Sequence, residues 1–176
     1  MSKKTINRLL VAIACLAAFY GLLIFLQYRQ TAPGAVVRIS TAGLSRSADR
    51  LVIRSDSRTA SLVRRGEKWF VGKKPVGNIK ISTLLQAIDK MVLVRVVTNK
   101  AGDLKTYGLT EAKSNFLKAY QGKKLLRAFY FGSMSDSNSY YVRTDRGLAV
   151  YEATGDLIFE VGQPSSGWGR AERVIK

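Results

Sequence analysis

Hydrophobic and polar residues alternate along several stretches of the chain in the manner of half-buried β-strands. Three pairs of such stretches are each joined by a short turn that contains glycine, which readily adopts the positive φ that tight turns require. These pairs predict hairpins over residues 60–71, 115–131 and 140–151. A further short β-rich stretch covers residues 51–53, and residues 41–50 are typical of a loop.

One clear helical pattern interrupts the predicted hairpins. Asn78 is a plausible N-cap, and the apolar residues after it recur with a period of 3.6 on one face. These residues are Ile81, Leu84, Leu85, Ile88 and Val92. A weaker helix is predicted over residues 156–161, ended by Gly162. Hairpins that flank one main amphipathic helix predict an α+β fold, an antiparallel sheet with one face covered by the helix.

The N-terminal region has a different pattern. Residues 9–26 carry no charge and would span about 27 Å as a helix, close to the ~30 Å thickness of the hydrocarbon core of a bilayer. Lys3, Lys4 and Arg8 precede this run, which predicts that the N-terminus stays in the cytoplasm. We therefore expect a single-pass protein of the bacterial inner (cytoplasmic) membrane, with its C-terminal domain in the periplasm or outside. The expected parts are residues 1–8, the cytoplasmic N-terminus; 9–28, a transmembrane helix; 29–35, a linker; and 36–176, one extracytoplasmic domain.

Two alternatives exist for the same apolar run. A cleaved signal peptide usually has a shorter apolar core, and residues 31–33 form a poor cleavage site. A lipoprotein would use Cys15, but the run continues for eleven residues beyond that cysteine. Small residues share one face of the predicted helix, which favours close packing of a partner helix, although alanine is also simple apolar filler. This face consists of Ala14, Ala17, Ala18 and Gly21.

Composition limits the chemistry available to the chain. It has no His and one Cys, so the usual general base and the usual metal ligands are absent. Residues 122–124 lack most of a phosphate-binding loop, and residues 136–138 resemble only a fragment of a calcium loop. No catalytic, cofactor-binding or metal-binding residue is therefore predicted, and we expect a protein that is not an enzyme.

The charge balance is the strongest chemical signal in the sequence. The chain has 29 Lys and Arg against 12 Asp and Glu, a formal net charge of +17 and a pI near 10.3. Basic clusters with neighbouring aromatic residues are typical of polyanion binding, although they also occur on a solvated basic face. The expected location favours an anionic membrane surface or an acidic partner over nucleic acid. The candidate contact residues are Arg64, Arg65, Lys68, Lys73, Lys74, Lys123 and Lys124.

A recurring order of aromatic, glycine, proline and leucine residues runs through the C-terminal two thirds of the chain. It consists of Trp69, Pro75, Tyr107, Gly108, Leu109, Gly132, Tyr141 and Tyr151, with the predicted helix between Pro75 and Tyr107. This pattern resembles an uncharacterised, membrane-anchored bacterial family associated with gliding-motility-type ABC transporter components. Members of that family often carry several copies of the unit, whereas this chain carries one.

Two functional hypotheses follow. The resemblance implies a non-catalytic accessory or structural subunit of a bacterial membrane protein complex, associated with a transporter. The alternative, based on the charge, is a binding module for a polyanion: anionic lipid headgroups, an envelope polysaccharide or nucleic acid.

Overall fold

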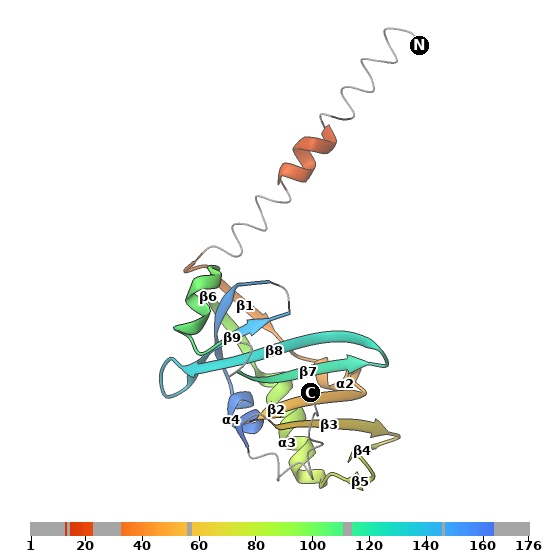
Figure 1. The fold of residues 1–176 in the computed structure, drawn as a ribbon. Coiled ribbons are helices and arrows are strands. Elements are labelled where there is room, and N and C mark those ends of the chain that lie inside the picture. Colours follow the sequence, from red (N-terminus) through yellow and green to blue (C-terminus); the bar gives the residue numbers. More distant parts are fainter. Residues whose placement is uncertain are drawn as a thin grey trace, which may run out of the picture.

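The computed structural model describes residues 13, 15–22, 33–55, 58–110, 114–145 and 147–163. Within these residues, ten strands form one sheet in the order β1-β6-β10-β9-β8-β7-β2-β3-β4-β5 (Figure 1). All neighbouring strands are antiparallel. The strands are β1 (Val36–Ser40), β2 (Arg50–Ser55), β3 (Arg58–Arg65), β4 (Lys68–Val71), β5 (Lys74–Pro75), β6 (Val92–Thr98), β7 (Asn115–Gln121), β8 (Lys124–Met134), β9 (Ser139–Thr144) and β10 (Val150–Thr154).

Short helices cover one face of this sheet. They are α2 (Leu44–Ser47), α3 (Asn78–Lys90) and α4 (Leu157–Gly162), and a 3₁₀ helix, η1, follows β6 at Ala101–Lys105. Both α2 and α4 contact α3, and α4 also contacts β2 and β7. The helix α3 connects β5, at one edge of the sheet, to β6, near the other edge, so it must cross the sheet (Figure 1).

The core lies between the helices and the sheet. Alternate residues of β2, Leu51 and Ile53, are buried on the helix side, and Leu117 of β7 and Phe129 of β8 join them. We call this side the core face, and the opposite side the open face. Because side chains of a strand alternate between the two faces, residues 52 and 54 of β2 lie on the open face.

The structure confirms some of the local predictions and corrects others: residues 41–50, expected to form a loop, contain the short helix α2. The three predicted hairpins correspond to β3–β4, β7–β8 and β9–β10. The main helix starts at Asn78, but its N-cap is Gly77 without a side-chain hydrogen bond, so the prediction of Asn78 as the cap is wrong. Val92 belongs to β6 and not to the helix. The weaker predicted helix is present as α4.

The predicted fold class is wrong. The described chain is nearly all sheet with a few short helices, whereas we expected an α+β domain behind a transmembrane helix. The reason is that β1, β2 and β6 join the hairpins through pairing between residues far apart in sequence, β1 with β6 and β2 with β7. These pairings merge separate hairpins into one ten-stranded sheet.

The predicted single-pass membrane anchor is also corrected. Within the part of the chain that the structure describes, no helix reaches the length and apolarity needed to cross a bilayer. The expected inner-membrane location and periplasmic domain depended on the predicted membrane helix, so these expectations are corrected as well. Residues 9–12, 14 and 23–28 of the predicted span lie outside the described residues.

Candidate functional site

Four side chains from four adjacent strands form one row across the open face. Arg54 of β2 lies opposite Phe116 of β7, Phe116 lies opposite Tyr130 of β8, and Tyr130 lies opposite Arg143 of β9. Residues that are directly opposite in an antiparallel sheet share a face, with strands about 4.8 Å apart. The row, which we call the cation–aromatic row, therefore extends about 14 Å across the strands.

The groups of this row contact one another. The Phe116 and Tyr130 rings meet edge to face, with centroids 6.1 Å apart. The Arg54 guanidinium carbon lies 4.6 Å from the Phe116 centroid, and that of Arg143 lies 4.4 Å from the Tyr130 centroid. Lys118, two residues beyond Phe116, places its ammonium 4.8 Å and 5.7 Å from the two ring centroids. Three cations thus lie over two rings, an arrangement that cation–π attraction stabilises.

Two hydrogen bonds fix one end of the row. Arg54 donates from Nε and from one terminal nitrogen to the carbonyl oxygen of Ser114, at 3.1 and 2.6 Å. Lys118 has no carboxylate within ion-pair distance among the residues that the structure describes. The row therefore combines cationic groups whose positions are fixed by ring contacts and, for Arg54, by hydrogen bonds.

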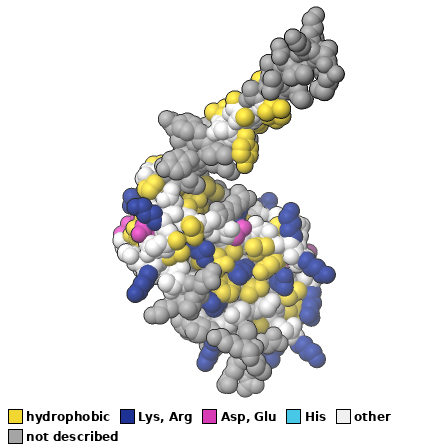
Figure 2. Space-filling view, turned by 45° about the horizontal axis from the view of Figure 1, so that its top comes forward, with side chains coloured by type: hydrophobic (Ala, Val, Ile, Leu, Met, Phe, Trp, Pro, Cys, Tyr) yellow, Lys and Arg dark blue, Asp and Glu magenta, His cyan; other side chains and the backbone are white. Residues whose placement is uncertain are grey.

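Further contacts between a guanidinium group and an aromatic ring occur toward strands β2, β3 and β4. The Arg50 guanidinium lies 4.2 Å from the Tyr120 ring centroid, and the Arg65 guanidinium lies 5.3 Å from that of Phe70. Figure 2 shows one face of the molecule on which Lys and Arg side chains are interspersed with hydrophobic ones, while coloured acidic side chains are few. Pairs of a basic side chain and an aromatic ring therefore also occur outside the cation–aromatic row.

An acidic residue near the row is neutralised by its own partner. Glu152 of β10 accepts hydrogen bonds from the Arg95 guanidinium and from the Ser135 hydroxyl. The bond from Arg95 holds the pKa of Glu152 below its usual range, and Glu152 raises the pKa of Arg95. Since the carboxylate is satisfied by Arg95, it offsets little of the charge of the cation–aromatic row.

The sequence-predicted basic clusters do not form one site. Arg64 and Lys123 come together with Arg50 and Asp49 around a shallow depression of about 380 Å³. There Asp49 accepts the backbone N–H of Gly122 at 2.7 Å and so ties the β7–β8 turn to the start of β2. The other cluster residues lie on exposed hairpin ends: Arg65 and Lys68 beside the β3–β4 turn, Lys73 in the β4–β5 turn, Lys74 at the start of β5, and Lys124 at the start of β8.

Several residues of the recognised pattern meet at a tight turn against β8. Ser133 donates its backbone N–H to the Tyr107 carbonyl at 3.0 Å, and the Tyr107 ring packs edge to face on Tyr141 with centroids 4.6 Å apart. Leu109 is fully buried. Gly132 has no room for a Cβ, which would overlap the Tyr107 carbonyl oxygen and lie 3.1 Å from Leu109 Cγ. Gly108 adopts φ +73°, which glycine tolerates best.

The remaining residues of that pattern lie elsewhere. Trp69 is buried in the core and has the Arg64 guanidinium 6.0 Å from its ring centroid. Pro75 lies in β5 opposite Phe70. Tyr151 of β10 is buried on the core face. Their roles in the described structure are those of packing and hairpin geometry.

The predicted partner-helix face is only partly described. Ala17, Ala18 and Gly21 lie in the exposed helical run, and no atom approaches the position of a Gly21 Cβ within 4 Å. Ala14 lies outside the described residues. The calcium-loop fragment is a turn in which Asp136 accepts the backbone N–H groups of Asn138 and Ser139. Across the described ranges, no three Asp, Glu or Cys side chains gather closely enough to hold a metal ion.

A family model matches residues 72–168, more than half of the chain, under the description "Domain of unknown function (DUF4340)". The chain therefore belongs to the DUF4340 family, whose description assigns no activity. The match starts within the β4–β5 hairpin and includes α3, the Tyr107–Leu109 turn and the strands β7 to β10. No curated protein and no solved structure shows detectable similarity to the chain.

Proposed function

We propose that the protein is a non-catalytic binding module for a linear polyanion, and that the open face around the cation–aromatic row is its contact surface. The observation that supports this proposal is the row itself. It combines the guanidinium groups of Arg54 and Arg143, the ammonium of Lys118 and the two rings between them on four adjacent strands. The net charge of +17 adds a long-range attraction for anions.

Each group of the row has a part in such binding. Guanidinium groups donate paired N–H bonds to phosphate or carboxylate oxygens. Planar rings and guanidinium planes provide surfaces on which flat or apolar parts of a polymer can stack. The aromatic contacts and the Ser114 carbonyl hold the cations in place before the ligand arrives, which reduces the entropy lost on binding.

The geometry favours a polymer over a bilayer surface. The cations lie along a row on a sheet, which suits repeated anionic groups of an extended chain. The Phe116 and Tyr130 rings have cations over them, so these rings are poorly placed for insertion among acyl chains. We therefore expect a single-stranded oligonucleotide or an acidic polysaccharide to bind more tightly than vesicles that contain anionic lipid.

The proposal is tested with two variants of equal charge. The open-face variant carries Arg54→Gln, Lys118→Gln and Arg143→Gln, and the hairpin variant carries Lys73→Gln, Lys74→Gln and Lys124→Gln. Fluorescence anisotropy with a labelled oligonucleotide or polysaccharide, and sedimentation with vesicles, give the dissociation constants. We expect the open-face variant to bind the preferred polymer at least tenfold more weakly than the parent, and the hairpin variant to bind within about threefold of it.

Chemical unfolding controls for damage to the fold. If the triple variant is destabilised, the single change Lys118→Gln replaces it, because no described residue pairs with the Lys118 ammonium except the two rings. Equal affinity of the open-face and hairpin variants contradicts the proposal, and so does tighter binding to vesicles than to either polymer. The accessory-subunit hypothesis stays a prediction that co-purification would test.

A further inference from the structure

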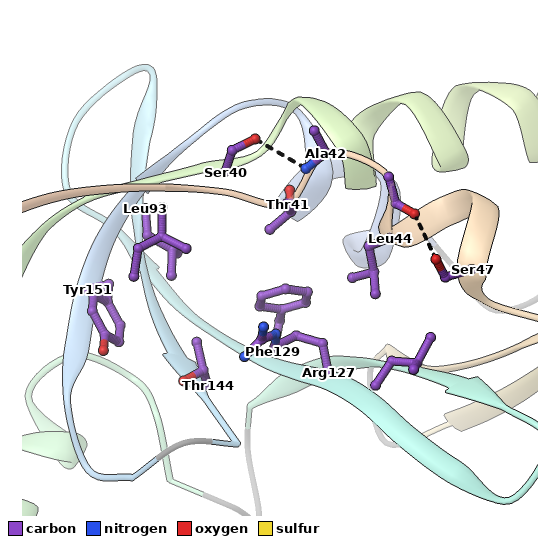
Figure 3. A pocket seen from close by; sticks show the side chains of 13 residues that line it. Ser40, Thr41, Ala42, Leu44, Ser47, Leu93, Arg127, Phe129, Thr144 and Tyr151 are labelled. Atoms are coloured by element: carbon purple, nitrogen blue, oxygen red, sulfur yellow. Dashed lines mark hydrogen bonds between the residues drawn. The ribbon is translucent and has the colours of Figure 1, made fainter.

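A pocket of about 550 Å³ opens on the core face, between the segment that links β1 to α2 and the strands β6, β8, β9 and β10 (Figure 3). This volume lies in the range typical of small-molecule sites. It is separate from the cation–aromatic row, because Arg127 and Phe129 of β8 point to the core face while Tyr130 points to the open face.

The walls of the pocket are mostly apolar. Leu93, Phe129 and Leu44 line it from three different elements, and hydroxyl groups of Ser40 and Thr144 add polar points to the lining (Figure 3). Among the lining residues that the structure describes there is no Asp or Glu. An apolar cavity of this kind suits the hydrocarbon part of a ligand.

One cation projects into this apolar space. Arg127 is the one charged residue among the described lining residues, and Figure 3 shows its guanidinium on the Thr144 side of the pocket. Within the described ranges Arg127 has no hydrogen-bond or ion-pair partner, and it is half-buried. A partly desolvated guanidinium gains free energy when an anion supplies acceptors, and a carboxylate fits its two parallel N–H groups.

The wall opposite β8 is held in place by the protein itself. The Thr41 hydroxyl lies within hydrogen-bond distance of two carbonyl oxygens at the C-terminal end of α3, those of Ile88 and Met91, and its single proton is shared between them. Ser45 donates its backbone N–H and its hydroxyl to the Asp89 carboxylate, at 3.1 and 2.5 Å. The pocket is therefore formed before any ligand enters, which lowers the cost of binding.

We infer that this pocket binds an amphipathic carboxylate, with the acid group on Arg127 and the hydrocarbon chain against Leu93, Leu44 and Phe129. The inference stands independently of polyanion binding, because the two surfaces are on opposite faces of the sheet. A medium-chain fatty acid has the required chemistry of one carboxylate and a flexible apolar chain.

The test uses the full chain and decanoate, titrated by calorimetry below the concentration at which decanoate forms micelles. We expect saturable binding of one decanoate by the parent, and at least tenfold weaker binding by Arg127→Met, which keeps the apolar stem and removes the charge. Lys124→Met is the control of equal charge on an exposed turn, and we expect parental affinity. Decylammonium, with the same chain and the opposite charge, should bind at least tenfold more weakly than decanoate.

Three results would overturn the inference. They are no saturable binding of decanoate by the parent, equal affinity of the parent and Arg127→Met, or equal affinity for decanoate and decylammonium. Unfolding midpoints show whether Arg127→Met keeps the fold, and Arg127→Lys, which keeps the charge, should recover part of the affinity. Polyanion binding by Arg127→Met is expected to stay within about threefold of the parent, since Arg127 lies on the core face and the three cations of the open face remain.

Discussion

Replacing Gly132 by alanine tests the contact on which the Tyr107–Leu109 turn depends. A Cβ at this position would overlap the Tyr107 carbonyl oxygen and press on the Leu109 side chain. The carbonyl is backbone and cannot rotate away by itself. The turn must therefore move off β8, or β8 must bend.

The structure gives the size of the expected effect. Moving the turn breaks the hydrogen bond from the Ser133 N–H to Tyr107, with a net cost of about 1 kcal/mol. It also exposes part of Leu109, which is fully buried and whose complete exposure would cost about 1.5–3 kcal/mol. We expect Gly132→Ala to lower the free energy of unfolding by about 2–4 kcal/mol.

Urea denaturation followed by circular dichroism measures this difference for the full chain. The matched control is Gly102→Ala in η1, where no atom lies within 4 Å of the added Cβ and φ is not positive. We expect the control to change the free energy of unfolding by less than about 0.5 kcal/mol. Gly132→Ala with the same midpoint and slope as the control would show that the turn does not pack on β8 as described.

Three further substitutions probe separate contacts. Hydrogen bonding to Arg95 lowers the pKa of Glu152, so the stability that this pair provides is present above the ordinary glutamate pKa and is lost as the pH falls. The difference in unfolding free energy between the parent and Glu152→Gln should therefore shrink from pH 7 to about pH 3, and a difference independent of pH would contradict this. Burial raises the pKa of Tyr140, so its contribution is present below the ordinary tyrosine pKa and decreases as the pH rises above it. Tyr140→Phe should consequently lose stability less steeply than the parent above about pH 10, in thermal melts across that range, and parallel losses would refute the assignment. Asp89→Ala removes the acceptor of two hydrogen bonds from Ser45 and should lower the free energy of unfolding by about 1–3 kcal/mol, whereas Glu67→Ala in an exposed turn should not. Equal urea midpoints for the two variants would show that the hydrogen bonds between Ser45 and Asp89 do not stabilise the fold.

The local elements of the fold could be predicted from the sequence because their signals are local. A glycine at a two-residue turn, such as Gly66 or Gly122 with positive φ, indicates a hairpin wherever it is found. The 3.6-residue period of Ile81, Leu84 and Ile88 likewise predicts a helix with one buried face.

The assembly of these elements could not be predicted in the same way. The pairing of β2 with β7 joins residues more than 60 positions apart, and nothing in either strand alone specifies its partner. Because this pairing could not be predicted, we expected an α+β domain, whereas the described strands form one ten-stranded sheet. The apolar, charge-free run at residues 9–26 predicted a membrane helix, but among the residues that the structure describes no helix is long and apolar enough to cross a bilayer.

The candidate site was missed for a related reason. The sequence draws attention to adjacent basic residues, such as Lys73 and Lys74, but neighbouring residues in a strand point to opposite faces, and many such pairs occur at turns. The members of the cation–aromatic row are instead spread over four strands, at positions 54, 116, 130 and 143. One local signal of the row is the alternation of half-buried and buried positions along β7, which places Phe116, Lys118 and Tyr120 on the same face.

The salt dependence of polymer binding tests the central claim most directly. For a single-stranded oligonucleotide, each phosphate contact by a cation contributes about 0.7 to the negative slope of log K against log salt concentration. If Arg54, Lys118 and Arg143 contact the polymer, the slope of the open-face variant should be shallower than that of the parent by about 2, while the hairpin variant keeps nearly the parental slope. Equal slopes for the parent and the open-face variant would show that the polymer does not bind at the open face.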